Sequence, residues 1–441
     1  MPATNPALTA TGGSISNVSL IMSKLEAHDL GPVAGNGLLP RRFFLTGGIA
    51  GLSLLRAVPP SAQQNVPVWM RAPGAPLRPY GERSPHEASV QRIVGSMPGT
   101  TGSGSSRTPL EFLEGMITPN SLHFERNHSG VPDIPLAQHR LVIHGLVRRP
   151  LTFDLETLTR YPLISRLYFI ECSGNSTALY APQPPQAGAG ALHGLVSCAE
   201  WTGVPLGTLL NEVGVHREGK WLIAEGADAA AMSRSIPMAK ALDDVMIALY
   251  QNGERLRPEN GYPMRLVVPG WEGNTNVKWL RRLKITADPV MTKDETSKYT
   301  DLLPDGTAWQ FTFPMAVKSV ITSPSGGLQM QGAGLYQISG IAWSDAGRIR
   351  RVEVSADAGK TWAPAALSAP VLPKALTRFR LAWRWNGGPA VLMSRAIDET
   401  GAVQPRREAL LGERGAAYRY HYHALQSWAV AATGEVRNVY V

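Results

Sequence analysis

Cysteine is scarce in this chain, which has two among its 441 residues, Cys172 and Cys198. Two cysteines exclude an extensive disulfide framework. They also lie too far apart to form the Cys-x-x-Cys-His sequence that attaches a c-type haem, so we expect no haem in this chain. A structural zinc site needs four side-chain ligands, which a single cysteine cannot supply by itself.

Long apolar runs are lacking as well. The stretch after Arg41 and Arg42, residues 43–55, is apolar but diluted by glycine, and it is shorter than the roughly 20 residues that a transmembrane helix needs. We therefore expect no membrane span. Two arginines before a short apolar run are typical of a twin-arginine export signal, here with a cleavage region at 59–62, and this predicts a periplasmic protein. The alternative is a helix at the start of a domain.

Charged residues make up only 17% of the chain, against 44% hydrophobic residues, which is typical of a globular protein. The 43 Lys and Arg exceed the 34 Asp and Glu and give a net charge of +9. No cluster of Lys and Arg with interleaved aromatic residues is present, so we expect no nucleic-acid partner. The moderate positive charge fits anionic ligands or an acidic protein partner better.

Proline (35) and glycine (44) are abundant and favour short strands and irregular connections over a helical bundle. Four parts are predicted: a leader with the export signal at 1–62, a Pro/Gly/Ser-rich arm at 63–109, an α+β domain at 110–300 and an immunoglobulin-like β-sandwich at 301–441. The fold class is therefore α+β, because short strands and helices alternate without a regular βαβ repeat.

Hydrophobic patterns predict the elements of both domains. In the α+β domain we predict strands at 140–147, 221–224, 245–250 and 264–268, a short helix starting at 152–159 and an amphipathic helix at 204–213. In the sandwich we predict strands at 335–343, 349–355, 377–385 and 390–396.

One turn of the sandwich has a recognisable sequence. Residues 355–362 resemble an Asp-box hairpin turn, which occurs once and so does not support a propeller of such repeats. We assign Asp357 and Gly359 to the turn and Trp362 to the core.

The run Leu167–Glu171 is apolar, aromatic and β-branched, and it predicts a buried strand that ends at Cys172. Ser173 and Gly174 follow in a turn of small residues, where a ligand can approach the backbone. A thiol at such a strand end suits a metal ligand or a nucleophile, because turn N–H groups favour the thiolate. The alternative is a buried apolar filler, which is how we interpret Cys198.

Four other stretches concentrate polar side chains among glycines: 122–132, 224–228, 261–279 and 298–299. Each alone has a structural explanation. Together, one thiolate and dispersed Arg, His, Asn, Asp and Lys side chains around Gly-rich loops suit a large, phosphate-bearing metal cofactor. Such a cofactor brings its remaining metal ligands with it.

These stretches carry a resemblance to a known family. The segments 124–128, 171–175 and 261–280 resemble the sulfite oxidase family of molybdopterin enzymes, and the likeness runs from about residue 110 to the carboxyl end. Residues 225–232 and 295–302 resemble the sulfane dehydrogenase branch of that family. The resemblance implies a molybdopterin-binding domain of the sulfite oxidase type followed by a dimerisation domain.

The resemblance also implies a molybdenum–molybdopterin cofactor, with Cys172 as the thiolate ligand of the metal. It implies catalytic roles for Cys172, Arg126 and Tyr299. The residues that it assigns to cofactor binding, besides Cys172, are Phe124, Arg126, Asn127, His128, Ser173, Gly174, Asp228, Arg265, Asn276, Val277 and Lys278.

Two departures from the family pattern bear on the substrate. Sulfite oxidases follow the cysteine with Gly-Asn-Arg-Arg, whereas this chain has Ser176 and Thr177 where those arginines stand. A further arginine of sulfite oxidases falls near residues 421–423, and the sequence does not decide between His421 and His423. The loss of two cations weakens the case for free sulfite, because paired arginine–oxyanion contacts are strong.

The resemblance therefore implies a two-electron oxidation of sulfane sulfur carried on a protein, as a step of thiosulfate oxidation. Because the chain has no haem site, we expect a separate c-type cytochrome subunit as electron acceptor, and a homodimer or heterotetramer core. The alternatives within the class are a sulfite dehydrogenase or a reductase with the same cofactor fold. The alternative outside it is a non-enzymatic exported binding or scaffold subunit.

Overall fold

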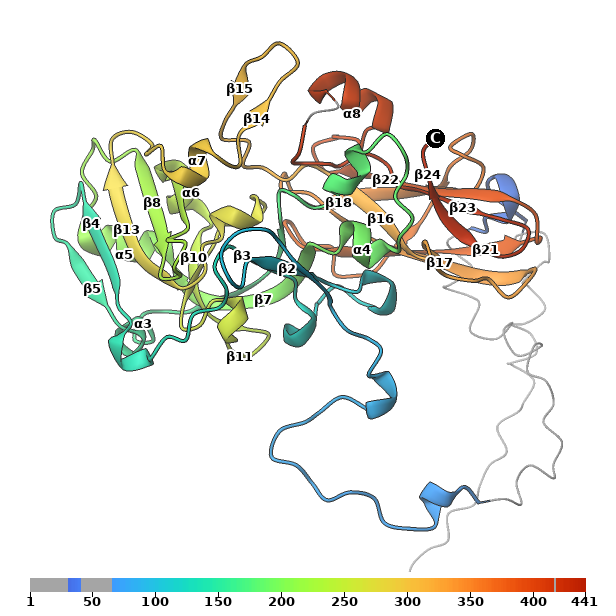
Figure 1. Ribbon diagram of the computed structural model, residues 1–441, viewed down its shortest axis with the longest axis horizontal. Helices are drawn as coiled ribbons and strands as arrows, with labels where there is room; N and C mark the ends of the chain where they lie inside the picture. The colour runs from blue at the N-terminus through green and yellow to red at the C-terminus, as the bar shows by residue number, and fades with distance from the viewer. Residues whose placement is uncertain (1–30, 41–65, 416–417) are drawn as a thin grey trace, which may run out of the picture.

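The structure is a computed structural model that describes residues 31–40, 66–415 and 418–441. Two domains lie side by side along the long axis, and an amino-terminal arm extends away from them (Figure 1). The predicted twin-arginine signal and its cleavage region lie outside the described residues and stay predictions, as do the predicted domain limits. Among the described residues, no helix combines the length and apolarity needed to cross a bilayer.

The first domain contains two five-stranded sheets, in which several neighbouring strands are not consecutive in the sequence. Their strands are β4 (Leu141–Gly145), β5 (Leu151–Phe153), β6 (Ile164–Glu171), β7 (Val196–Pro205), β8 (Trp221–Gly226), β9 (Ser233–Pro237), β10 (Met246–Gln251), β11 (Glu254–Arg255), β12 (Arg265–Val267) and β13 (Leu280–Thr286). One sheet has the order β11-β10-β7-β6, with β12 paired to β10, and the other has the order β5-β4-β13-β8-β9. Only β4 and β13 pair in parallel among the ladders of these two sheets.

Short helices connect these strands. They are α3 (Leu155–Leu158), α4 (Ala189–His193), α5 (Leu206–Val213), α6 (Met238–Asp243) and α7 (Lys293–Thr296). The predicted amphipathic helix is α5, which buries its leucines against the sheets and ends at Gly214, where the backbone turns left-handed. The helix predicted from residue 152 is partly wrong, because β5 runs to Phe153. Asp154 then caps α3 by accepting the Thr157 N–H at 2.8 Å.

Two sheets pack face to face in the second domain. Their strands are β16 (Lys318–Ser323), β17 (Gly334–Trp343), β18 (Ile349–Ser355), β19 (Ala363–Pro364), β20 (Ala366–Leu367), β21 (Thr377–Trp385), β22 (Ala390–Asp398), β23 (Ser427–Val430) and β24 (Val436–Val439). The strand orders are β16-β17-β21-β20 and β19-β18-β22-β23-β24, and α8 (Arg407–Arg414) lies in the connection before β23. The predicted α+β class with a carboxyl-terminal sandwich is confirmed.

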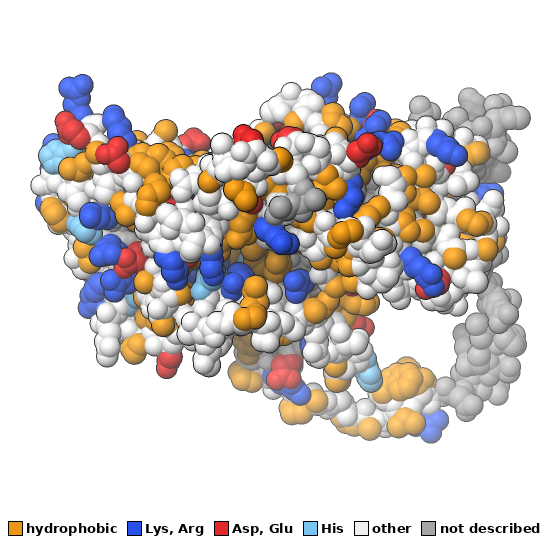
Figure 2. Space-filling model, turned by 45° about the horizontal axis from the view of Figure 1, so that its top comes forward, with side chains coloured by type: hydrophobic (Ala, Val, Ile, Leu, Met, Phe, Trp, Pro, Cys, Tyr) orange, Lys and Arg blue, Asp and Glu red, His pale blue; other side chains and the backbone are white. Residues whose placement is uncertain are grey.

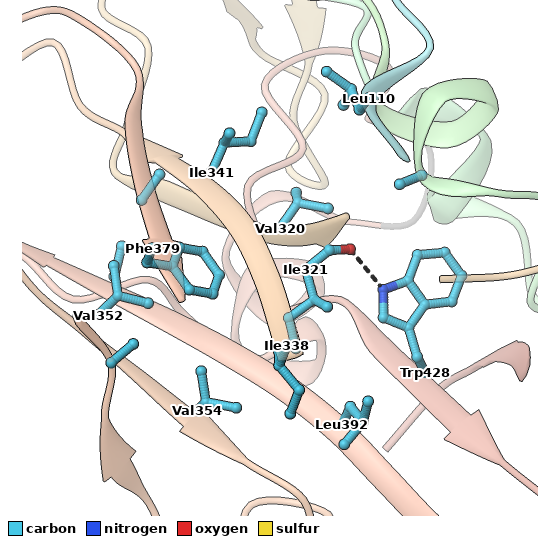
Figure 3. Packing of buried hydrophobic residues seen from close by; sticks show 14 of the residues in the cluster. Leu110, Val320, Ile321, Ile338, Ile341, Val352, Val354, Phe379, Leu392 and Trp428 are labelled. Carbon is cyan, nitrogen blue, oxygen red and sulfur yellow. Dashed lines mark hydrogen bonds between the residues drawn. The ribbon is translucent and has the colours of Figure 1, made fainter. Parts of the chain in front are cut away.

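Alternating side chains of the two sheets form the sandwich core (Figure 3). Ile338 and Phe379 come from one sheet, and Val352 and Leu392 from the other. The same apolar cluster continues into the first domain through residues such as Phe169 and includes the fully buried Cys198, as predicted for that cysteine. This cluster therefore joins the two domains, while two further apolar clusters lie wholly within the first domain.

Smaller elements surround the domain junction. They are β1 (Ile93–Ser96), β2 (Gly104–Arg107) and β3 (Glu125–Asn127), which form one sheet, and the hairpin of β14 (Asp301–Leu302) and β15 (Ala308–Trp309). The Asp-box turn forms as predicted, because Asp357 accepts the Thr361 N–H at 2.9 Å. Trp362, which we assigned to the core, is instead half-buried, with Arg395 4.3 Å above its ring.

Candidate active site

A cavity of the first domain brings together segments that are far apart in the sequence. All the predicted site residues line it except Ser173 and Gly174, which lie in the turn beside it. His123, Asn274 and Trp279 also line the cavity and fall within the polar stretches singled out in the sequence, without an assigned role, whereas Glu259 and Asn260 lie outside those stretches. Lys and Arg side chains gather around the middle of the molecular face that Figure 2 shows.

Cys172 stands at the end of β6, as predicted, where the strand opens into a tight turn. Its N–H donates to the Leu195 carbonyl at 2.9 Å, and its own carbonyl accepts the Asn175 N–H at 2.8 Å. Gly273 crosses so close that a Cβ there would lie 3.2 Å from the Cys172 Cα. Burial raises the pKa of the Cys172 thiol, with a backbone N–H of Gly174 opposing it. A metal cation bound to the sulfur would lower the pKa of the thiol again by stabilising the thiolate, so Cys172 suits a metal ligand.

Among the described residues, Arg265 and Lys278, like Arg126, line the cavity without a hydrogen bond to a carboxylate. Arg265 is 4% exposed and donates only to backbone carbonyls, those of Asn260 at 3.0 Å and Asn276 at 2.9 Å. Burial lowers its pKa to about 9. Lys278 donates to the Glu259 carbonyl at 2.9 Å and to the Asn127 side chain. Burial and the charge of Arg265 lower its pKa to about 7. Such a pair fits an anionic ligand group.

Further polar atoms on the cavity residues have no hydrogen-bond partner among the described residues. They are Nε2 of His123, Oδ1 of Asn260, Nε of Arg265 and Oδ1 of Asn274. Buried polar groups are normally satisfied, and their concentration here indicates the place of a large polar ligand. A phosphate-bearing pterin with a metal fits this set, because the set offers cations, neutral donors and acceptors, and one thiol.

Tyr299 and His128 form a hydrogen bond across the cavity, with 3.2 Å between the hydroxyl oxygen and Nε2. Burial raises the pKa of Tyr299 well above its ordinary value, so the hydroxyl keeps its proton. Burial and the charge of Arg126 lower the pKa of His128 to about 3, so the ring is neutral. Tyr299 therefore donates to His128. Its backbone is left-handed (φ 54°), a strained conformation that is common at functional sites.

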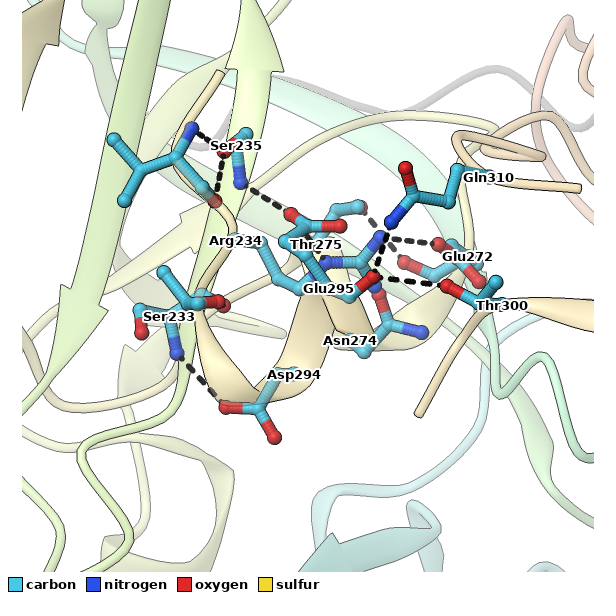
Figure 4. Close-up of polar contacts among 12 residues, drawn as sticks. Ser233, Arg234, Ser235, Glu272, Asn274, Thr275, Asp294, Glu295, Thr300 and Gln310 are labelled. Atoms are coloured by element: carbon cyan, nitrogen blue, oxygen red, sulfur yellow. Dashed lines mark hydrogen bonds and ion pairs between the residues drawn. The ribbon is translucent and has the colours of Figure 1, made fainter. Parts of the chain in front are cut away.

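Arg234 supports Tyr299 from behind and was missed by the sequence analysis. Its guanidinium is fully buried and forms ion pairs with Glu272 at 2.8 Å and Glu295 at 3.0 Å (Figure 4). It lies 5.0 Å from the centre of the Tyr299 ring. Although burial opposes its ionisation, the charge of Arg234 holds the pKa of Glu272 at about 2. The one signal in the sequence that could have pointed to Arg234 as a functional residue was the presence of an arginine in a buried strand, β9.

Ser176 and Thr177, which the sequence resemblance aligns with arginines of sulfite oxidases, are occupied in holding the turn. The Ser176 hydroxyl accepts from Lys318 Nζ at 2.8 Å and pairs with His193 at 2.7 Å. The Thr177 hydroxyl lies 2.7 Å from the carbonyls of Gly174 and Arg419, to which it donates. Neither side chain therefore presents a charge or a free donor to a substrate.

Neither His421 nor His423 is among the residues that line the cavity, so the alternative left open by the sequence stays open, but the backbone of the thiol turn is contacted by His421. Its N–H donates to the Ser173 carbonyl at 2.8 Å, and its Nε2 lies 3.1 Å from the Thr312 hydroxyl and 3.5 Å from Glu272. His423 Nδ1 lies 2.9 Å from the His421 carbonyl, one step further from the turn.

Comparison with known proteins shows what the chain resembles. A family described as oxidoreductase molybdopterin binding domain matches residues 128–293, and one described as Mo-co oxidoreductase dimerisation domain matches residues 310–425. Sulfite oxidase of Gallus gallus is 32% identical over 331 residues, which cover 68% of this chain and 71% of that protein. Inducible nitrate reductase [NADH] 2 of Glycine max is 32% identical over 365 residues, 73% of this chain and 40% of that protein.

A solved structure is more similar in sequence. The sulfane dehydrogenase SoxCD from Paracoccus pantotrophus matches with 46% identity and a TM-score of 0.85, covering 87% of this chain and 100% of that one.

Proposed function

Since the chain belongs to the sulfite oxidase family of molybdopterin oxidoreductases, we propose that it is a dehydrogenase for sulfane sulfur carried on a protein. The cofactor of this family, molybdenum held by molybdopterin, supplies two-electron redox chemistry when bound. The nitrate reductase match means that family membership alone does not identify the substrate. The residues around the thiol therefore carry the choice.

The chain's own residues divide the work of such a site. Cys172 would hold the metal, and Arg265 and Lys278 would hold the phosphate end of the cofactor, whose negative charge their burial requires. Tyr299 keeps a proton available beside the thiol, and Arg126 offers the positive charge that an anionic product needs.

The observation that carries the substrate proposal is the missing pair of cations. By the sequence resemblance, Ser176 and Thr177 stand where sulfite oxidases have arginines, and both hydroxyls are used inside the turn. The Nε2 of His421 lies 3.1 Å from the Thr312 hydroxyl, and His421 is not among the residues that line the cavity. A small dianion such as sulfite would lack two strong charge-assisted contacts here, whereas sulfur bound to a carrier protein needs them less.

Purified holoprotein tests this directly. We expect reduction of cytochrome c with a carrier protein that bears sulfane sulfur and little reduction with free sulfite. Thr177→Arg should raise kcat/KM for sulfite by about tenfold, the effect of one charge-assisted contact. Thr433→Arg, at an exposed turn of the sandwich, is the matched control and should change nothing. Rapid turnover of sulfite by the unaltered enzyme at low concentration would refute the proposal.

The partner, the compartment and the assembly are parts of the same proposal. A separate c-type cytochrome takes the electrons, because the two cysteines cannot bind a haem covalently. The twin-arginine sequence supports a periplasmic location, and Arg41→Lys with Arg42→Lys should retain the protein in the cytoplasm. The match to a dimerisation domain supports a dimer, measurable by light scattering. Metal analysis tests the non-enzymatic alternative, since matured protein without molybdenum would exclude the enzyme.

A further inference from the structure

A short piece of the predicted leader lies on the surface of the folded sandwich. Residues 33–39 run beside β21, although the two segments lie more than 300 positions apart in the sequence (Figure 1). Leu38 is fully buried and Leu39 is 2% exposed, and Leu38 belongs to the apolar cluster of the sandwich. Two leucines of a leader are thus part of the core of a domain more than 300 residues away.

Backbone contacts fix this piece at the edge of the sheet. The Leu39 N–H donates to the Ala382 carbonyl at 3.0 Å, and Leu38 forms a β-bridge with Trp383. The Trp383 indole N–H in turn donates to the Asn36 carbonyl at 2.6 Å. The contact is made on the part of β21 that lies beyond its pairing with β20 at Phe379 and Arg380, and it has the character of strand addition, in which main-chain bonds give affinity and side-chain pockets give specificity.

The Asp-box turn, residues 355–362, contacts residues 33–39 from the other side, and we call the surface between β21 and this turn the groove. The Gly35 N–H donates to the Thr361 hydroxyl at 2.7 Å, and the Asn36 amide donates to the Ala356 carbonyl at 2.7 Å. A Cβ on Gly35 would lie 2.2 Å from an Asp357 carboxylate oxygen. The Asp-box turn, which is not part of the cavity of the first domain, therefore contacts the leader.

The leader sequence fits this groove through its small residues. A Cβ on Gly37 would lie 2.1 Å from the Arg384 carbonyl oxygen, and Gly37 has a φ of +83°, which favours glycine. Asn36 has a φ of 56°, which asparagine tolerates better than most residues. By contrast, a Cβ on Gly31 would meet nothing within 4 Å.

We propose that the sandwich carries a binding site for the chain's own leader, residues 33–39, and that this docking restrains the export signal. Only Pro40 separates the docked piece from Arg41 and Arg42. Because β21 and the Asp-box turn make the groove, it exists only after the sandwich has folded. While residues 33–39 are docked, the signal that follows them in the sequence is tethered to the folded sandwich until the leader is pulled away. The docking does not depend on the proposed enzymatic activity.

Hydrogen exchange of the full-length precursor tests the docking. We expect the amides of residues 33–39 to exchange at least about tenfold more slowly than those of an unstructured peptide of the same sequence. Gly37→Val should abolish this protection, because the branched side chain meets the Arg384 carbonyl. Gly31→Val is the matched control and should keep it. Exchange at the free-peptide rate in the unaltered precursor would overturn the proposal.

Processing of the precursor in cells tests the restraint. The Gly37→Val precursor should be converted to the mature form at a rate several-fold above that of the Gly31→Val precursor. Equal conversion rates, with protection lost only in Gly37→Val, would refute the restraint. Both readouts are independent of sulfur oxidation, so their failure would leave the proposed enzyme untouched, and loss of activity would leave the docking untouched.

Discussion

Lys278 makes the pH dependence of the cofactor-free protein a test of the anion site. Its pKa lies at about 7 in the folded protein, below the ordinary value of 10.5, because burial and Arg265 disfavour its charge. Between these two values the unfolded chain binds a proton that the folded chain has released. Stability therefore rises with pH through this window, and the penalty for the charged form is complete below about pH 7.

The size of the effect follows from the shift. Each pH unit inside the window changes the free energy of unfolding by at most about 1.4 kcal/mol, so the two units from pH 7.5 to 9.5 give at most about 3 kcal/mol. Lys278 is partly exposed through the cavity, and solvent screening reduces this to about 1–2 kcal/mol. The hydrogen bonds of Lys278 to Asn127 and Glu259 contribute a pH-independent amount to the free energy of unfolding, which cancels when the slopes against pH are compared.

Urea denaturation of cofactor-free protein, followed by tryptophan fluorescence at several pH values, measures the slopes. We expect the unaltered chain to gain about 1–2 kcal/mol relative to Lys278→Met over this range. Lys293→Met, at an exposed lysine of α7, should run parallel to the unaltered chain. With cofactor bound, the phosphate would restore the charge of Lys278 and remove the difference. Parallel slopes for the unaltered chain and Lys278→Met without cofactor would refute the reasoning.

Three further predictions concern the groups around the thiol. Glu171→Gln leaves Lys318 buried without its carboxylate, so the free energy of unfolding should fall by about 3–5 kcal/mol in urea denaturation, and adding Lys318→Met should restore most of it. Arg234 holds the pKa of Glu272 at about 2, below the ordinary 4.5, so the stability from this pair is present above about pH 4.5 and is lost as the pH falls toward 2. Arg234→Met should therefore flatten the fall of Tm between pH 5 and 3. An equally steep fall of Tm in the variant would contradict this. Tyr299→Phe should lower kcat about 100-fold with an unchanged circular dichroism spectrum, whereas an unchanged kcat would exclude the hydroxyl from proton transfer.

The sequence predicted the parts of the site that stand at strand ends. Cys172 directly follows the buried strand β6 and begins a turn of small residues, a local pattern that can be recognised without knowing the fold. Arg234 could not be found in this way, because its partners Glu272 and Glu295 lie 38 and 61 positions further along the chain. The packing of β9 against both the Gly-rich loop and α7 brings them together.

Other features depended on contacts between domains. His421 and His423 are two positions apart and equivalent by residue type, and only the bond to the Ser173 carbonyl distinguishes them. Leu38 and Leu39 stand in a polar, Gly-rich leader, where two leucines alone do not predict burial. Trp362 fits an alternating pattern, but the turn directs its ring toward Arg395 at the surface.

The thiol turn is held from both domains, since Lys318 of β16 bonds Glu171 and Ser176 from the sandwich side. This makes the catalytic half unsuitable as a transplantable module. A chimera that joins the first domain to the sandwich of a relative would keep its sheets and its cavity, yet it would lose the cation that neutralises Glu171 unless that relative also supplies one. Recombination within this family is therefore constrained to exchange the strand before the thiol and the first strand of the sandwich together.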